Sequence, residues 1–177
     1  MTRTLSPLIL PPLTLVLGGQ RSGKSVYAES LFAAGRPALY VATAEAGDRE
    51  MAERIAAHKA RRGRGWETRE EPIEIARALG ASNKPALVEC LSLWVSNLMD
   101  ARRDLAAETD ALLAAAAARA APSVIVSVEA GLGVVPDNAL ARAWLDAVGL
   151  VNQKIAAAAG RVVLVTAGLP LILKDTA

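Results

Sequence analysis

The sequence predicts an α/β domain whose central sheet is mainly parallel and flanked by helices. Apolar runs of strand length recur along the chain, they are continuous rather than alternating, and segments with helical patterning separate most of them. Continuous apolar runs are typical of strands that are covered on both faces. Strands that alternate with helices are joined by crossover connections, which give parallel pairing.

The expected elements follow one another along the whole chain. Strands are expected at Leu13–Leu17, Ala38–Ala42, Ala86–Glu89, Ser123–Val128 and Arg161–Thr166, with a short edge strand at Leu169–Leu173. Helices are expected at Ser25–Ala34, Arg49–Lys59, Ile73–Leu79, Leu91–Ala101, Leu105–Ala121 and Asn138–Ala158.

Several local features support these helices and their boundaries. Asp48 stands directly before the second helix as a candidate N-cap. Leu112–Ala121 is rich in alanine, the best helix former. Gly63 and Gly65, set among basic residues, predict a mobile loop. The last helix carries apolar residues near helical spacing, namely Leu140, Trp144, Val148, Val151 and Ile155.

Length and composition favour one domain in a reducing compartment. A chain of 177 residues, 53% of them hydrophobic, is enough for one core. Residues 1–12, broken by prolines, are expected to be a flexible extension before a catalytic domain at 13–177. A net charge of +2 gives no reason to expect a nucleic-acid or membrane partner, and no apolar run is long enough to span a membrane. The single Cys90 cannot form an internal disulfide and is read as a buried apolar residue, so we expect a cytoplasmic protein.

The strongest motif is a glycine-rich loop between the first strand and the first helix. It matches the P-loop pattern G-x-x-x-x-G-K-[ST] and reads Gly18-Gly19-Gln20-Arg21-Ser22-Gly23-Lys24-Ser25. Backbone N–H groups of such a loop, with the N-terminus of the following helix, surround phosphate oxygens. We expect Lys24 to reach the terminal phosphates and the Ser25 hydroxyl to bind Mg²⁺. The sequence therefore predicts a P-loop NTPase-like domain that binds a nucleotide.

The only histidine, His58, is the candidate nucleophile. It shares a helix face with Met51 and Ile55, and this apolar face by itself favours a packed core histidine. Basic residues follow it, including Arg61 and Arg62, which resemble a cluster that neutralises phosphate. A solvated basic loop is the alternative interpretation of that cluster. Neutral imidazole is a competent nucleophile toward an activated phosphoryl group.

Carboxylates stand at the ends of two expected strands. Glu89 ends the third run and Glu129 follows the fourth. Ligands of open α/β sheets bind beyond the carboxyl ends of the strands, where a carboxylate can hold Mg²⁺ directly or through water. We favour Glu89 for this role, with a solvent-facing charge as the alternative.

Together these stretches resemble the adenosylcobinamide kinase / adenosylcobinamide-phosphate guanylyltransferase family, over about Leu13 to Lys174. Besides the P-loop, the resemblance rests on Tyr40–Thr43, Glu50–Met51 with Arg54–His58, Glu89–Leu98, and Glu129–Asn138 with Asn152–Gln153. The P-loop is generic, whereas the histidine segment and Gly133–Asn138 are far more specific. Two departures stand out: many relatives carry two adjacent histidines where this chain has Ala57-His58, and tend to have Asn where it has Val128.

The resemblance implies an enzyme of cobalamin biosynthesis with two reactions. In the first, the γ-phosphate of ATP or GTP passes to the aminopropanol hydroxyl of adenosylcobinamide. In the second, GTP forms a GMP–histidine intermediate, and GMP passes to adenosylcobinamide phosphate to give adenosylcobinamide-GDP. The matching histidine is His58. The resemblance also implies a homo-oligomer, with a trimer as the expected form.

Two other functions are compatible with the motifs alone. One is a P-loop small-molecule kinase in which His58 is structural. The other is a non-catalytic nucleotide-binding regulatory module. Trapping of a guanylylated protein distinguishes the first alternative from the bifunctional enzyme, and any group transfer excludes the second.

Overall fold

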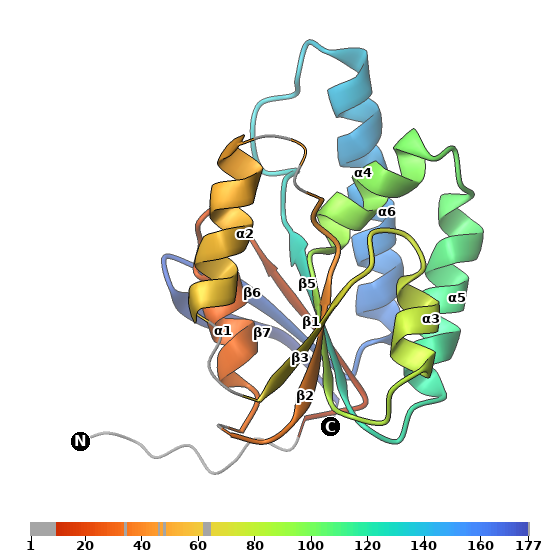
Figure 1. The fold of residues 1–177 in the computed structure, drawn as a ribbon. Coiled ribbons are helices and arrows are strands. Elements are labelled where there is room, and N and C mark those ends of the chain that lie inside the picture. The colour runs from red at the N-terminus through yellow and green to blue at the C-terminus, as the bar shows by residue number, and fades with distance from the viewer. Residues whose placement is uncertain (1–9, 34, 46, 48, 62–64, 177) are drawn as a thin grey trace.

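A computed structural model gives the fold of the chain (Figure 1). It describes residues 10–33, 35–45, 47, 49–61 and 65–176. The strands are β1 (Leu13–Gly18), β2 (Ala38–Ala42), β3 (Trp66–Glu70), β4 (Ala86–Glu89), β5 (Ser123–Val128), β6 (Arg161–Thr166) and β7 (Leu169–Asp175). The helices are α1 (Lys24–Ser30), α2 (Arg49–Arg61), α3 (Ile75–Gly80), α4 (Leu91–Asp100), α5 (Leu105–Ala117) and α6 (Ala139–Ala158).

The strands form one sheet in the order β3-β2-β4-β5-β1-β6-β7. All pairs are parallel except β6 with β7, which are antiparallel. The expected α/β fold with a mainly parallel sheet is confirmed. Because β1 lies between β5 and β6, it is an interior strand, and ligands of such folds bind beyond the carboxyl ends of the strands.

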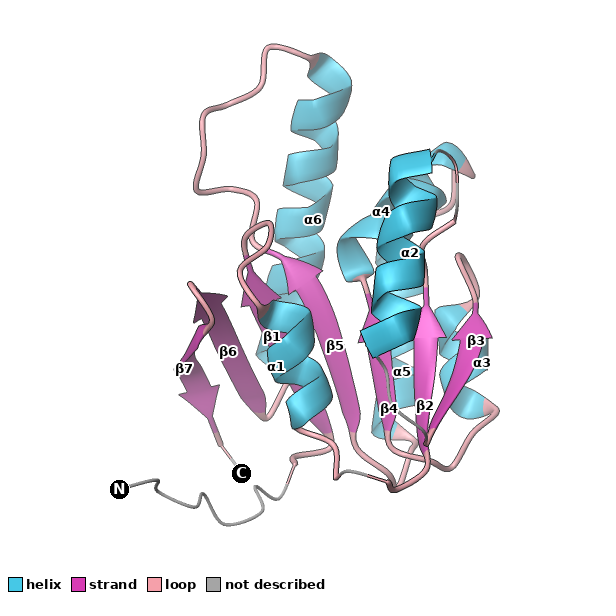
Figure 2. Cartoon of the chain, turned by 60° about the vertical axis from the view of Figure 1, so that its left-hand side comes forward, coloured by secondary structure: helices cyan, strands magenta, loops and turns pink. Residues whose placement is uncertain are grey.

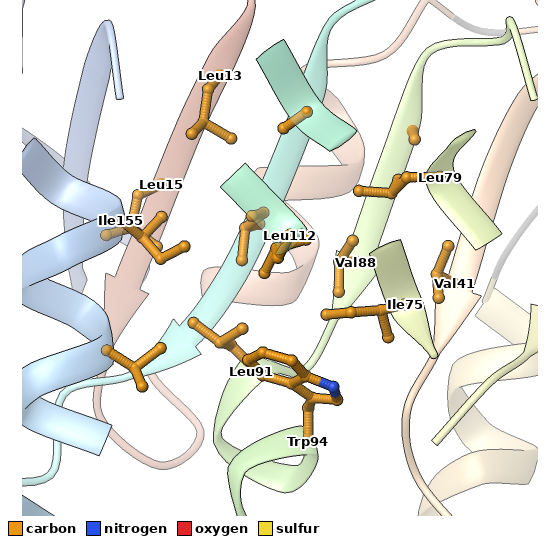
Figure 3. Close-up of a cluster of buried hydrophobic side chains, with 14 of the residues drawn as sticks. Leu13, Leu15, Val41, Ile75, Leu79, Val88, Leu91, Trp94, Leu112 and Ile155 are labelled. Atoms are coloured by element: carbon orange, nitrogen blue, oxygen red, sulfur yellow. The ribbon is translucent and has the colours of Figure 1, made fainter. Parts of the chain in front are cut away.

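Helices cover both faces of the sheet. Figure 2 shows α1 and α2 on one face and α3 to α6 on the other. The larger core cluster lies under α3 to α6, and Figure 3 shows Leu91 and Trp94 of α4 with Leu112 of α5 and Ile155 of α6. These four side chains are fully buried, so most of the apolar burial that stabilises the fold lies on this face.

One strand was not predicted from the sequence. Trp66–Glu70 forms the edge strand β3, paired in parallel with β2. Only Trp66 and Arg69 of this strand are partly buried and the rest is exposed, so it lacks the apolar run that identified the other strands. Edge strands are often polar, because charge opposes edge-to-edge pairing with other chains.

Two expected helix ends differ by several residues from those in the structure, and some residues named in the sequence analysis lie outside the described residues. The first helix ends at Ser30 rather than Ala34, and the Ala-rich helix α5 ends at Ala117 rather than Ala121. Asn138 caps α6, its side chain accepting from the backbone N–H groups of Leu140 and Ala141. Asp48 and Gly63, like residues 1–9 of the expected extension, lie outside the described residues. In the described part of the chain, no helix is both long and apolar enough to cross a membrane.

Candidate active site

The P-loop connects the carboxyl end of the interior strand β1 to α1. Arg21 and Gly23 adopt the left-handed region, with φ of 55° and 93°. Left-handed residues beside right-handed ones turn successive backbone N–H groups toward one side, which makes an anion-binding concavity. A side chain at Gly18 would clash as well, because a Cβ there would lie 2.4 Å from Ser22 Oγ and 2.6 Å from the backbone carbonyl oxygen of Val165.

The hairpin between β6 and β7 supports the P-loop from one side. The N–H of Gly168 donates to the carbonyl of Ser22 at 2.8 Å. A Cβ on Gly23 would lie 3.2 Å from the Cα of Gly168, so the two backbones are nearly in contact. Sequence reasoning did not find this support, although the Ala167-Gly168 pair between two apolar runs is a turn signal.

Ser25 and Glu89 are brought together although they are far apart in the sequence. Ser25 Oγ, in the first turn of α1, donates to Glu89 Oε1 at the end of β4 over 2.6 Å. The Lys24 ammonium donates to the Gly19 carbonyl at 3.2 Å, so the lysine lies over its own loop. Hydroxyl and carboxylate oxygens are hard donors, and Mg²⁺ in nucleotide enzymes takes few protein ligands besides phosphate and water. The donor set therefore fits a Mg²⁺ that accompanies a nucleotide.

Glu129 is placed differently from Glu89. Its N–H donates to the Gly18 carbonyl at 3.1 Å, and its carboxylate accepts from the N–H of Gly131 at 3.2 Å. The side chain thus stabilises the start of its own loop, while its backbone continues the pairing of β5 with β1. The side-chain amide of Asn152, on α6, donates to the Val128 carbonyl at 3.0 Å and so fixes the end of β5, just before Glu129.

Cys90 follows Glu89 and occupies the N-cap position of α4, although its side chain makes no capping hydrogen bond. Its Sγ lies 2.8 Å from Ser92 Oγ. Burial raises the pKa of the Cys90 thiol, and the neighbouring Glu89 carboxylate raises it further. A thiol whose pKa is raised stays protonated at neutral pH, so these features favour a structural cysteine over a nucleophile.

The side chains of His58 and Arg61, and Arg62 as a whole, lie outside the described residues. The helix that carries His58 is described: α2 stands on the same face of the sheet as α1 (Figure 2). From the basic segment, Lys59 forms an ion pair with Glu70 of β3 at 2.6 Å. Both side chains are largely exposed, so this pair contributes little stability.

A cavity of about 320 Å³ lies elsewhere, at the opposite end of the strands. Pro11, Leu13 and Gly160, at the starts of β1 and β6, line it together with residues at the end of α5. Its lining is mainly apolar and includes neither the P-loop nor Glu89. None of the residues that the motifs single out for phosphate chemistry lines this cavity.

Fold and loop geometry define a P-loop nucleotide-binding protein. The fold is shared with an ATPase of a type III secretion system of pathogenic bacteria, with a TM-score of 0.53 and 9% identity over 86% of this chain. This chain spans 50% of that ATPase, and the likeness concerns the fold alone.

Sequence comparison identifies the family. The family model described as cobinamide kinase / cobinamide phosphate guanyltransferase matches residues 14–173, and the chain belongs to this family. A bifunctional adenosylcobalamin biosynthesis protein CobP of Pseudomonas aeruginosa is 45% identical over 90% of this chain and 96% of its own length. The CobU proteins of Escherichia coli and Salmonella typhimurium are 37% and 38% identical, each over 92% of this chain and 99% of its own length. The resemblance noted from the motifs is confirmed, and membership of an enzyme family argues against a non-catalytic module.

Proposed function

We propose that this enzyme phosphorylates adenosylcobinamide with ATP or GTP and then transfers GMP from GTP to the product. Membership of the cobinamide kinase / cobinamide phosphate guanyltransferase family supports both activities. The observation that carries the assignment of the site is the 2.6 Å contact between Ser25 and Glu89, since it joins the P-loop to a strand-end carboxylate.

In the kinase step, the P-loop binds the triphosphate. Backbone N–H groups of Gly18–Ser25 surround the phosphate oxygens, and the Lys24 ammonium moves from the Gly19 carbonyl to the terminal phosphates. The acceptor hydroxyl oxygen forms a bond to the γ-phosphorus and its proton passes to solvent. The bond to the bridging oxygen breaks, and the nucleoside diphosphate leaves with the electrons of that bond. Ser25 and Glu89 would hold Mg²⁺, which when bound neutralises charge on the phosphates.

In the guanylyltransferase step, His58 is the nucleophile. A neutral imidazole nitrogen bonds to the α-phosphorus of GTP, and pyrophosphate leaves with the electrons of the broken P–O bond. A phosphate oxygen of adenosylcobinamide phosphate then displaces the histidine, giving adenosylcobinamide-GDP. Arg61 and Arg62 are proposed to stabilise the negative charge of the leaving pyrophosphate. His58 is the only histidine in the chain, so no other imidazole can take this role.

We further propose that the enzyme is a cytoplasmic homo-oligomer, with a trimer as the expected form. Large apolar side chains are exposed in the loop between β5 and α6, where Val134 is 95% exposed, and along β7, where Leu169 is 73% exposed. Large apolar side chains that gather on a surface often mark association sites, and this supports the proposal. Light scattering coupled to size-exclusion chromatography tests this: a mass near three chains supports the proposal, and a monomer contradicts it.

The experiment that tests the proposed function is a two-stage assay with purified protein. Adenosylcobinamide with ATP and Mg²⁺ should yield its phosphate, and addition of GTP should then yield adenosylcobinamide-GDP and pyrophosphate. Formation of the phosphate without any GDP derivative would favour the simple kinase with a structural His58.

A further inference from the structure

Thr43 directly follows β2 and is completely buried. Its N–H donates to the Glu89 carbonyl at 3.0 Å. Its hydroxyl accepts from the N–H of Cys90 at 2.8 Å and donates to the Cys90 carbonyl at 2.7 Å. The peptide group between Glu89 and Cys90 is thus held by one residue at both its oxygen and its nitrogen.

Asn97 holds Thr43 in turn. The Asn97 side-chain amide, on α4, donates to the Thr43 carbonyl at 2.9 Å and to the Pro72 carbonyl at 3.0 Å. Pro72 follows β3, so this amide links the ends of β2 and β3 to the helix that begins after Glu89. The N–H, the carbonyl and the hydroxyl of Thr43 thus all form hydrogen bonds. The N–H and the hydroxyl bond Glu89 and Cys90, and the carbonyl is held by Asn97.

From this geometry we infer that Thr43 is a positioning residue, which sets the place of the Glu89 carboxylate opposite Ser25. The inference rests on the proposed role of Glu89 at the Mg²⁺ site. The hydrogen bond between Ser25 Oγ and the Glu89 carboxylate joins α1 to β4. A small rotation of the Glu89 backbone would therefore move the carboxylate away from Ser25. The Thr43 hydroxyl opposes that rotation, because it acts as donor and acceptor on the residue that follows Glu89.

A second buried threonine, Thr109, forms a hydrogen bond within its own helix and serves as a comparison. Thr109 on α5 is 1% exposed, and its hydroxyl donates to the Leu105 carbonyl one turn earlier in the same helix. Thr43 instead bonds Cys90, a residue 47 positions away that directly follows the strand carrying Glu89. Thr109→Val is therefore a matched control for Thr43→Val, because each removes one buried, hydrogen-bonded hydroxyl.

The test measures metal binding separately from catalysis. Mn²⁺ is titrated into the full-length protein in the presence of GDP and followed by electron paramagnetic resonance, with thermal melting measured in parallel. Thr43→Val should weaken Mn²⁺ binding about tenfold or more, the size of effect usual for partners that orient a metal's ligands. Thr43→Ser keeps the hydroxyl and should bind Mn²⁺ like the wild type, as should Thr109→Val. The Mg²⁺ concentration for half-maximal kinase rate should rise in Thr43→Val to a similar degree.

Wild-type Mn²⁺ affinity in Thr43→Val would overturn the inference, and so would equal weakening in Thr43→Ser. If Thr43→Val does not fold, Asn97→Ala carries the test: weakened Mn²⁺ binding supports the inference, and unchanged binding overturns it. The titration needs no corrinoid. A wild-type protein that shows the Mn²⁺ pattern but phosphorylates no adenosylcobinamide would overturn the proposed function and leave the positioning role supported.

Discussion

Gly18, the last residue of β1, is the P-loop position where the structure leaves no room for a side chain. A methyl group there would lie 2.4 Å from Ser22 Oγ and 2.6 Å from the Val165 carbonyl oxygen. Val165 is the partner of Gly18 in the β1–β6 ladder, so its carbonyl cannot move without disturbing the sheet. At Gly19, the next residue, a methyl group would meet nothing within 4 Å. Gly18→Ala and Gly19→Ala are therefore a matched pair.

The magnitude follows from the contacts. Forcing a methyl group into a packed site typically costs about 1–3 kcal/mol. In a domain of this size each kcal/mol lowers Tm by about 2–4 °C, so Gly18→Ala should lower Tm by about 2–12 °C. Gly19→Ala should stay within about 0.5 kcal/mol of the wild type, as substitutions without new contacts usually do. Ser22 belongs to the P-loop and must move in Gly18→Ala, so this variant should also bind GTP more weakly than the wild type.

Thermal melting and GTP calorimetry on both variants test this reasoning. The expected result is a destabilised Gly18→Ala with weakened GTP binding beside a Gly19→Ala of wild-type stability. Equal stability of the two variants would refute it, because a methyl group would then fit between Gly18 and β6.

Three further substitutions have defined outcomes. Lys24→Ala should lower both transfer rates at least about 100-fold, as loss of a preorganised charge does, with wild-type melting; wild-type turnover would refute the P-loop assignment. Glu89→Gln keeps the shape of the side chain and should raise the Mg²⁺ requirement of the kinase about tenfold; an unchanged requirement would make Glu89 a strand-end charge only. Asp175→Ala removes the bidentate partner of buried Arg161 and should cost about 1.5–3 kcal/mol by urea denaturation, whereas a smaller loss would show that this pair does not hold β7.

Most of the sheet could be predicted because its strands are buried on both faces. The runs at β2, β4, β5 and β6 are read from the sequence with the bounds that the structure gives. The edge strand β3 could not be predicted, because an exposed strand with a polar sequence has no apolar pattern to detect. Helix ends were predicted less well, since alanine favours the helix without defining where it stops.

The site was predictable where a local motif encodes it and not where distant segments meet. The glycine loop and the strand-end Glu89 were both named from the sequence, and the structure places Glu89 against Ser25. The hydrogen bond from Gly168 to the P-loop and those between Thr43 and the Glu89–Cys90 peptide group depend on which strand ends lie next to each other. Strand order is a property of tertiary packing, and a single sequence gives no local signal of it.

Protein labelling by GTP tests the central claim most directly. The claim is that His58 forms the GMP intermediate, whereas phosphoryl transfer to adenosylcobinamide needs Lys24, Ser25 and Glu89 but not His58. With GTP labelled at the α-phosphate, the wild type should form an acid-labile protein adduct. His58→Asn, which keeps a polar side chain of similar size without a nucleophilic nitrogen, should form none and should still phosphorylate adenosylcobinamide. A His58→Asn protein that still becomes labelled would contradict the account.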